Sequence, residues 1–162
     1  MRDKALRQPL GPVRRATADD APAIAALLDV VRIEIGLGPT ATASRLEEWV
    51  HRDLQGTRDI AWIRMAGALA VVLLVLHRSG AEDEREVLYL ARAPDWARSR
   101  LGQRRLEAVQ RLAVKRNWKW LTARTRPWNK PAIALLRKVG FRFYRTEADN
   151  GVDWRWFRWR VR

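Results

Sequence analysis

Cysteine is absent from the 162-residue sequence, so disulfide bonds, thiolate metal sites and a cysteine nucleophile are excluded. Long apolar runs are absent as well: the longest covers residues 68–76, less than half of the ~20 residues that a membrane-spanning helix needs. Residues 1–11 carry charges and lack the apolar stretch of a secretory signal. From these absences we expect a cytoplasmic protein that does not enter the membrane.

Histidine and the common catalytic motifs are scarce too. The two histidines, His51 and His77, lie far apart in the sequence and have no carboxylate at metal-ligand spacing. No GxxxxGK[ST], HExxH or GxSxG motif occurs. The sequence therefore predicts no metal site.

Apolar residues are plentiful: 48% of the sequence is hydrophobic and 31% is charged, a composition typical of a folded protein. A domain of this length buries roughly 70% of its unfolded-chain surface, so it can be stable without disulfides or metals. No internal repeat or low-complexity linker divides the sequence. We expect a basic, flexible lead-in over residues 1–12 and a single domain over residues 13–162.

Positive charge is abundant and unevenly distributed. The formal net charge is +14, and it is concentrated in residues 85–162, where 21 Lys and Arg face 6 Asp and Glu for a net of +15. Such a one-sided cationic surface attracts polyanions such as cofactor phosphates or nucleic acid. We predict weak polyanion binding through a basic surface of this half. Its expected members are Arg104, Arg111, Lys115, Arg116, Arg124, Arg126, Lys130, Arg137 and Lys138.

Hydrophobic periodicity predicts alternating strands and helices. Strands are expected at 13–16, 60–65, 68–76, 87–91, 118–125, 141–146 and 152–161, and helices at 17–36, 42–56, 101–116 and 130–139. Asn150-Gly151 is a strong hairpin signal, and Gly140 suits the left-handed end of a helix. The order β-α-α-β-β-β-α-β-α-β-β predicts an α/β (α+β) fold with a mixed, mostly antiparallel sheet flanked by helices.

Nine tryptophans are unusual for this length, and the densest stretch, residues 154–160, reads Trp-Arg-Trp-Phe-Arg-Trp-Arg. Its near-alternation indicates a strand with aromatic rings on one face and arginines on the other, with a bulge near Phe157. Rings interleaved with guanidinium groups could stack bases and neutralise phosphates. A terminal strand that packs tryptophan against a helix has the same pattern, and we prefer this structural interpretation.

Three local sequences carry a family resemblance. Pro94-Asp95-Trp96 follows a strand and is followed by Gly102, Asn129 follows the strand 118–125, and residues 129–141 read Asn-Lys-Pro-Ala-Ile-Ala-Leu-Leu-Arg-Lys-Val-Gly-Phe. The chain thereby resembles the GCN5-related N-acetyltransferase (GNAT) superfamily, which has stretches similar to V-x-P-E-Y-R-G-x-G-x-G and N-x-x-A-I-x-L-Y-E-K-x-G-F at these places. The resemblance implies a GNAT-like domain that transfers an acyl group, in the first place acetyl from acetyl-CoA, to an amine.

The loop before the third helix is where the resemblance places the cofactor phosphates. A loop that enters a helix presents free backbone N–H groups, and glycine permits close approach. Gly102 is retained, but Ala97 and Arg100 replace the family's Arg or Gln and its first glycine, and nearby arginines could pair with phosphates instead. A degraded site with solvated arginines is the alternative. The candidate cofactor-binding residues are Ala91, Arg92, Ala93, Arg98, Ser99, Arg100, Leu101, Gly102, Gln103 and Asn129, the last of which could also be an ordinary helix cap.

The resemblance also locates an acid and a base. The family tyrosine that often protonates the leaving CoA thiolate corresponds to Leu136, and leucine cannot be a general acid. Tyr144 and Tyr89 are the only phenols that could replace it, and a core or rim position is the plain alternative for both. Glu86 is the candidate base, ahead of Asp95, with a surface glutamate as its alternative.

Two other functions remain open on the sequence. The altered loop and Leu136 are compatible with a protein that keeps the fold and only binds CoA or a polyanion. The basic second half is compatible with an acyltransferase whose acceptor amine is carried by a nucleic acid. The acceptor, the acyl length and the oligomeric state, a homodimer among the options, are not determined by the residues.

Overall fold

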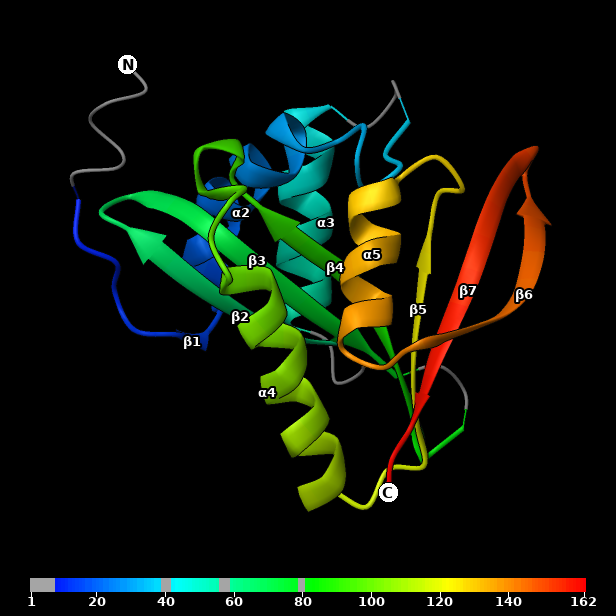
Figure 1. Cartoon of the computed structure of the whole chain (residues 1–162). Helices are drawn as coiled ribbons and strands as arrows, with labels where there is room; N and C mark the ends of the chain where they lie inside the picture. Colours follow the sequence, from blue (N-terminus) through cyan, green and yellow to red (C-terminus); the bar gives the residue numbers. More distant parts are fainter. Residues whose placement is uncertain (1–7, 39–41, 56–58, 79–80) are drawn as a thin grey trace. The chain divides into compact units, whose positions relative to one another are not determined.

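The computed structural model describes residues 8–38, 42–55, 59–78 and 81–162 (Figure 1). Their helices and strands follow the predicted order. The elements are β1 (Arg14–Arg15), η1 (Ala18–Asp20), α2 (Ala21–Val30), α3 (Ala43–Gln55), β2 (Asp59–Ala66), β3 (Leu69–His77), β4 (Glu84–Arg92), η2 (Pro94–Trp96), α4 (Leu101–Lys115), β5 (Trp120–Thr125), α5 (Lys130–Lys138), β6 (Arg142–Asp149) and β7 (Val152–Arg160).

The seven strands form one sheet in the order β1-β2-β3-β4-β5-β7-β6. β4 and β5 run parallel, whereas β1–β2, β5–β7 and β6–β7 pair antiparallel. The predicted mixed, mostly antiparallel sheet flanked by helices is therefore confirmed.

The chain divides into two compact units. The first contains the chain up to Val75 together with Tyr89–Gly102, and the second contains Leu76–Leu88 and Gln103–Arg162. The division passes through β3, through β4 and through the first turn of α4, so each of these elements contributes to both units.

In the first unit, β3 is the most completely buried strand described, with every residue from Ala70 to Val75 at most 7% exposed. Its apolar run predicted a strand covered on both faces, and the burial confirms it. Helices α2 and α3 pack against each other (Figure 1). The apolar residues Ile24, Leu27 and Leu28 of α2 are buried, as their three- and four-residue spacing predicted.

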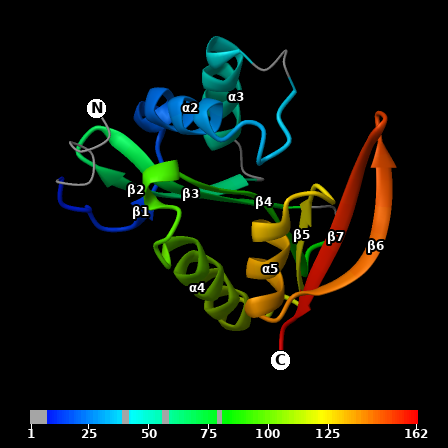
Figure 2. The same ribbon diagram turned by 45° about the horizontal axis from the view of Figure 1, so that its top comes forward.

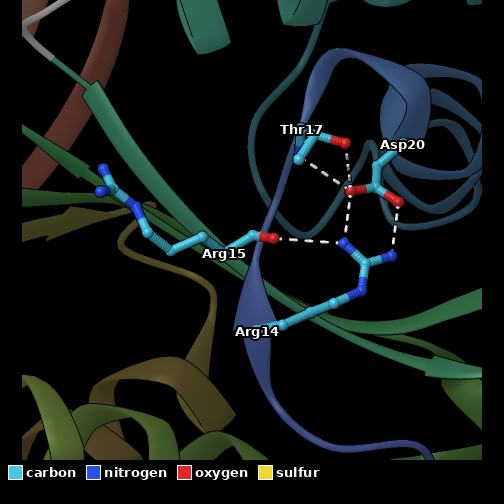
Figure 3. A network of polar contacts seen from close by, with 4 residues as sticks. All are labelled: Arg14, Arg15, Thr17 and Asp20. Carbon is cyan, nitrogen blue, oxygen red and sulfur yellow. Dashed lines mark hydrogen bonds and ion pairs between the residues drawn. The ribbon is translucent and has the colours of Figure 1, made fainter.

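A polar network attaches β1 to the start of α2 (Figure 3). Both terminal guanidinium nitrogens of Arg14 donate to the Asp20 carboxylate at 2.7 Å, and the Thr17 N–H donates to it at 2.8 Å. Asp20 is only 8% exposed. The carboxylate thus satisfies a helix-start N–H and an arginine on the neighbouring strand at once.

In the second unit, helices α4 and α5 lie on the same side of β5 and β7 (Figure 2). The Gln110 side chain of α4 donates to the Val139 carbonyl at the end of α5, 2.7 Å away. Leu121 and Phe157, which project to one side of β5 and β7, are fully buried. Asn150 and Gly151 both have positive φ, 51° and 75°, as the predicted two-residue hairpin requires.

Several element boundaries differ from the sequence prediction: β4 begins at Glu84 instead of residue 87, and β6 continues to Asp149 instead of ending at residue 146. The first long helix ends at Val30, and irregular turns continue to Gly36, whose φ is 76°. The strand expected from residue 118 begins at Trp120, because α4 is closed by Asn117 at φ 56° and a hydrogen bond from the Trp118 N–H to the Ala113 carbonyl. Asn117 therefore occupies the left-handed position that usually belongs to glycine.

Candidate functional site

The loop between β4 and α4 is compact and internally hydrogen-bonded. η2 closes it through the Trp96 N–H on the Ala93 carbonyl and the Ser99 N–H on the Trp96 carbonyl, both at 2.9 Å. The Ser99 hydroxyl donates to the same Trp96 carbonyl at 2.6 Å. These bonds hold the backbone that leads into the first turn of α4.

Arg92, the last residue of β4, joins the strand to this loop. Its guanidinium donates to the Ser99 carbonyl at 3.2 Å. Burial lowers the pKa of Arg92, and the nearby Glu34 carboxylate opposes this effect. Arginine still keeps its charge, so Arg92 is a half-buried cation that helps to position the loop.

Apolar packing fixes where α4 begins. Leu101 is 7% exposed and packs with Ala66, Val71 and Val72 of β2 and β3, while Trp96 and Ala93 cover the same cluster. In the first turn of a helix the N–H groups have no partner within the helix. In α4 these groups belong to Leu101, Gly102 and Gln103, and the positive end of the helix dipole adds to them.

Two arginines of the loop, Arg98 and Arg100, are exposed, and Arg104 is exposed one turn into α4. They lie within a few residues of a helix start that already favours anions, so this stretch of the chain combines backbone donors with side-chain cations. Ala91 is buried within β4, and Ser99 is held by its hydroxyl bond. All of the predicted loop residues from Ala91 to Gly102 belong to the first unit.

Glu86 lies in the second unit, on the β4 segment that pairs with β5. It is 7% exposed, which corrects the alternative of a surface glutamate. The cause is its place in the sheet: Glu86 aligns with Thr122 of β5, and both residues are buried. The Nε of Arg124, two residues further along β5, lies 3.7 Å from the Glu86 Oε1.

Tyr144 lies on β6 at an irregularity of the strand. The β6–β7 register shifts between Phe143 and Arg145, which is a β-bulge. The Tyr144 ring meets the Trp156 ring edge-on at 6.5 Å, and the Arg158 guanidinium lies 5.0 Å from it. Burial raises the pKa of Tyr144, and Glu84 and Glu86 add to the increase while Arg145 and Arg158 oppose it. The phenol therefore keeps its proton at neutral pH.

Glu86 and Tyr144 thus belong to the same unit, on β4 and β6, with β5 and β7 between these strands. The remaining phenol, Tyr89, belongs to the part of β4 in the first unit. Asp95 is exposed on η2.

The other two predicted positions, at the start of α5 and within it, have clear structural roles. Leu136 is 6% exposed, so a buried apolar side chain occupies the position of the family tyrosine. Asn129 caps the helix: its Oδ1 accepts a hydrogen bond from the Ala132 N–H at 3.2 Å. The capping interpretation is confirmed, and a cofactor contact of Asn129 stays a prediction.

Arg124 belongs to the candidate site, although the sequence analysis did not place it there. It was assigned only to the basic surface, yet it is half-buried, 3.7 Å from both Glu86 and Asp149, and its guanidinium lies over the Trp154 ring at 4.5 Å. The signal was its even spacing from Trp120 and Thr122, which places all three on one face of β5. Without the strand pairing, that face could not be connected to Glu86.

No described part of the chain brings together three or more residues able to hold a metal ion. None of the described helices has both the length and the apolar character of a membrane span.

Comparison with known proteins gives one family and a group of similar folds. The model of the acetyltransferase (GNAT) domain matches residues 13–142. No protein of curated function shows significant sequence similarity to the chain.

Three solved structures illustrate the likeness in fold. The ribosomal-protein-S18-alanine N-acetyltransferase from Escherichia coli is 18% identical with a TM-score of 0.74, and the match covers 93% of each chain. A spermidine N-acetyltransferase from Vibrio cholerae is 14% identical with a TM-score of 0.74 and 94% of each chain covered. An acetyltransferase from Thermus thermophilus is 22% identical with a TM-score of 0.71, over 94% of this chain and 97% of the other.

Proposed function

Because the chain belongs to the GNAT acetyltransferase family, we propose that it transfers the acetyl group of acetyl-CoA to an amine. The family match supports acyl transfer in general. The choice of acetyl-CoA as donor and of an amine as acceptor is our inference from the site.

The β4–α4 loop is the observation that carries the donor half of the proposal. The N–H groups of Leu101, Gly102 and Gln103 at the start of α4, with the exposed Arg98 and Arg100 beside them, suit a pyrophosphate. Arg100 stands where the family has a glycine, and its guanidinium supplies a paired donor in place of a closer backbone approach. The residues present therefore fit the phosphates of acetyl-CoA, whose thioester would supply the activated acetyl group.

The acceptor half rests on Glu86 and Tyr144. Glu86 accepts the proton that an amine must lose, and the Arg124 guanidinium lies 3.7 Å from its carboxylate. Backbone N–H groups of β4 hold the developing oxyanion. Tyr144, whose raised pKa keeps it protonated, donates to the leaving sulfur in place of the missing family tyrosine.

Calorimetry with CoA and acetyl-CoA tests the donor site directly. We expect Gly102→Val to weaken binding by about tenfold or more, because a branched side chain in the first helical turn blocks the approach of phosphate to the N–H groups. Gly38→Val is the control in the same unit, since a Cβ at Gly38 meets nothing within 4 Å. If the two variants bind alike, the donor phosphates lie elsewhere.

Thiol release against a panel of amines tests the transfer. Release that depends on both acetyl-CoA and an amine supports the proposed reaction. Tight binding of acetyl-CoA with no release for any amine would contradict the acceptor class.

A further inference from the structure

The β5–β7–β6 sheet has a face that the acetyl-transfer site does not use in full. Strand register places Trp120 opposite Arg160, and Arg124 opposite Trp156, while Arg142 lies opposite Arg158. We call this surface the tryptophan–arginine face. Its aromatic and basic members are Trp120, Arg124, Arg142, Tyr144, Arg145, Trp154, Trp156, Arg158 and Arg160, and the register places Thr122, Glu147 and Asp149 on the same face.

This arrangement corrects the sequence interpretation of the last strand. The pairing of β5 with β7 runs without interruption from Trp120 to Thr125, so no bulge falls in β7, and the irregularity lies opposite Phe157, in β6. Rings and arginines are therefore mixed on one face instead of separated: Trp154 and Trp156 share it with Arg158 and Arg160. The opposite face carries Phe157 and Trp159.

Guanidinium groups stack on the rings across this face. Arg158 lies 4.5 Å from the centre of the Trp120 ring and 5.0 Å from that of Tyr144. Arg145 lies 4.9 Å from Trp156, and Arg160 lies 6.0 Å from Trp120. A guanidinium that stacks by its plane leaves its N–H edge free to donate to an anion.

Only part of this positive charge is neutralised within the protein. Arg124 is close to Glu86 and Asp149, and Arg145 bonds Glu147 at 2.9 Å. The side chains of Arg142, Arg158 and Arg160 form no hydrogen bond or ion pair with any residue that the structure describes, and all three are exposed. Like charges directly opposite on paired strands are destabilising. An anion bound between Arg142 and Arg158 would reduce their mutual repulsion.

The helices of this unit do not cover the tryptophan–arginine face. α4 and α5 lie on the same side of β5 and β7 (Figure 2). That side is the opposite face, because a Cβ at Gly140, just after α5, would lie 3.5 Å from the Trp159 ring. The stacked arginines consequently belong to a sheet surface of the second unit that its own helices leave open.

We propose that the tryptophan–arginine face binds single-stranded nucleic acid. Trp120 and Trp154 are half-buried and offer stacking surfaces, whereas Trp156 is buried. The three uncompensated guanidinium groups neutralise successive phosphates, and rings with such cations are the combination by which strand-binding proteins recognise unpaired bases. An acidic protein segment would use the charges and would have no need of interleaved rings. The binding does not depend on acetyl transfer.

Fluorescence anisotropy of a labelled oligouridine of about 12 nucleotides tests the site, a length within the range that one strand-binding domain covers. We expect a Kd of ~10⁻⁴–10⁻⁶ M at moderate salt. Arg158→Gln with Arg160→Gln should weaken binding about tenfold or more. Loss of two phosphate contacts should also lower the slope of log K against log salt by about 1.4.

A charge-matched control separates this face from general attraction. Arg15→Gln with Arg155→Gln removes the same charge from exposed positions outside this face and outside the basic surface, since Arg155 lies opposite Thr125 on the other face of β7. We expect that pair to change affinity by less than about threefold, because salt screens charges that lie away from the bound strand. Equal losses in the two double variants would overturn the assignment to the strands.

Trp120→Leu tests the rings, because it keeps every charge. We expect about a tenfold loss of affinity for the oligouridine, as loss of one stacked base predicts. The melting temperature of each variant is measured alongside, and Trp154→Leu provides a second ring if Trp120→Leu unfolds the chain. Unchanged affinity in both ring variants, or displacement of the oligouridine by polyglutamate of equal charge as readily as by unlabelled strand, would overturn the proposal. Equally tight binding of a duplex would do so as well.

Discussion

Asp20 is a buried carboxylate whose hydrogen bonds join two elements, and its ionisation should affect stability. The Arg14 guanidinium lowers the pKa of Asp20 below its ordinary value, although burial opposes the effect. Because the folded pKa lies below the unfolded one, the stabilisation is present above about pH 4 and is lost as the pH falls through the folded pKa.

Asp20→Asn should therefore lower the free energy of unfolding by about 1–2 kcal/mol at pH 7, the lower part of the range for a buried charged hydrogen bond because the Arg14 side chain is 45% exposed. Urea unfolding at pH 7 and at about pH 3 measures it. The difference between wild type and variant should shrink at the lower pH. A difference that is constant with pH would show that the carboxylate is not the ionised partner of Arg14.

Leu136 is buried where the family has a tyrosine, and a larger polar side chain should not fit without cost. Leu136→Tyr should lower stability by about 1–3 kcal/mol through overpacking, and Leu136→Met by less than about 1.5 kcal/mol. Both are expected to leave the affinity for CoA nearly unchanged. If thermal unfolding shows no loss for Leu136→Tyr, the position has room for a phenol, and the variant's rate of thiol release becomes the test of its use as an acid.

Glu86 offers the sharpest kinetic test of the proposed base. Glu86→Gln should lower kcat by ~10²–10⁴ and leave the affinity for acetyl-CoA unchanged, because general base assistance is lost and the donor loop is intact. Glu84→Gln, two residues earlier on the same face of β4, is the matched control and should retain most of the rate. Similar rates for the two variants would remove Glu86 from the mechanism.

At the scale of elements, the β6–β7 hairpin depends on the backbone of its turn. Gly151 has a φ of 75°, and a Cβ added there would meet no atom within 4 Å, whereas Gly38 has the same open space without a positive φ. Gly151→Ala should cost about 1–2 kcal/mol because an L-residue is strained there, and Gly38→Ala should be neutral within about 0.5 kcal/mol. Chemical denaturation measures the free energy of unfolding of both variants. Because neither added Cβ meets a neighbouring atom, the difference between them reports the effect of backbone conformation. Equal stabilities would mean that the turn relaxes to another geometry.

At the scale of the molecule, the positive charge of residues 85–162 should produce polyanion binding that depends on the charge of the ligand and does not require bases. Arg104, Arg111, Arg137 and Lys138 are exposed, as the predicted basic surface requires, whereas Arg124 and Arg126 are half-buried and stack on Trp154. Heparin binding should be measurable at about 50 mM salt and fall steeply by about 200 mM, by roughly 10³-fold or more for ~6 contacts. Trp120→Leu should not affect it, since heparin has no bases to stack. Binding that is insensitive to salt would exclude an electrostatic origin.

Much of the architecture could be predicted from the residues because local signals agreed. The apolar run of β3, the Asn150-Gly151 turn and the Gly140 helix end each indicated one conformation, and each occurs. The motif around Asn129 and the strand–loop–helix at Gly102 led to the right family. Such features depend on neighbours in sequence, which is why they can be recognised before folding is known.

The sequence alone therefore determined the order of elements, the family and the position of the β4–α4 loop. Tertiary structure decided which side chains share a surface. Only the β4–β5 register brings Glu86 beside Arg124 and buries it, and only the bulge in β6 turns Tyr144 toward Trp156 and Arg158. Alternation within β7 could not show which rings and arginines meet, because a shift of one residue in strand register moves every side chain to the opposite face. The physical reason is that pairing between distant strands, unlike a turn or a cap, is set by the packing of the whole sheet.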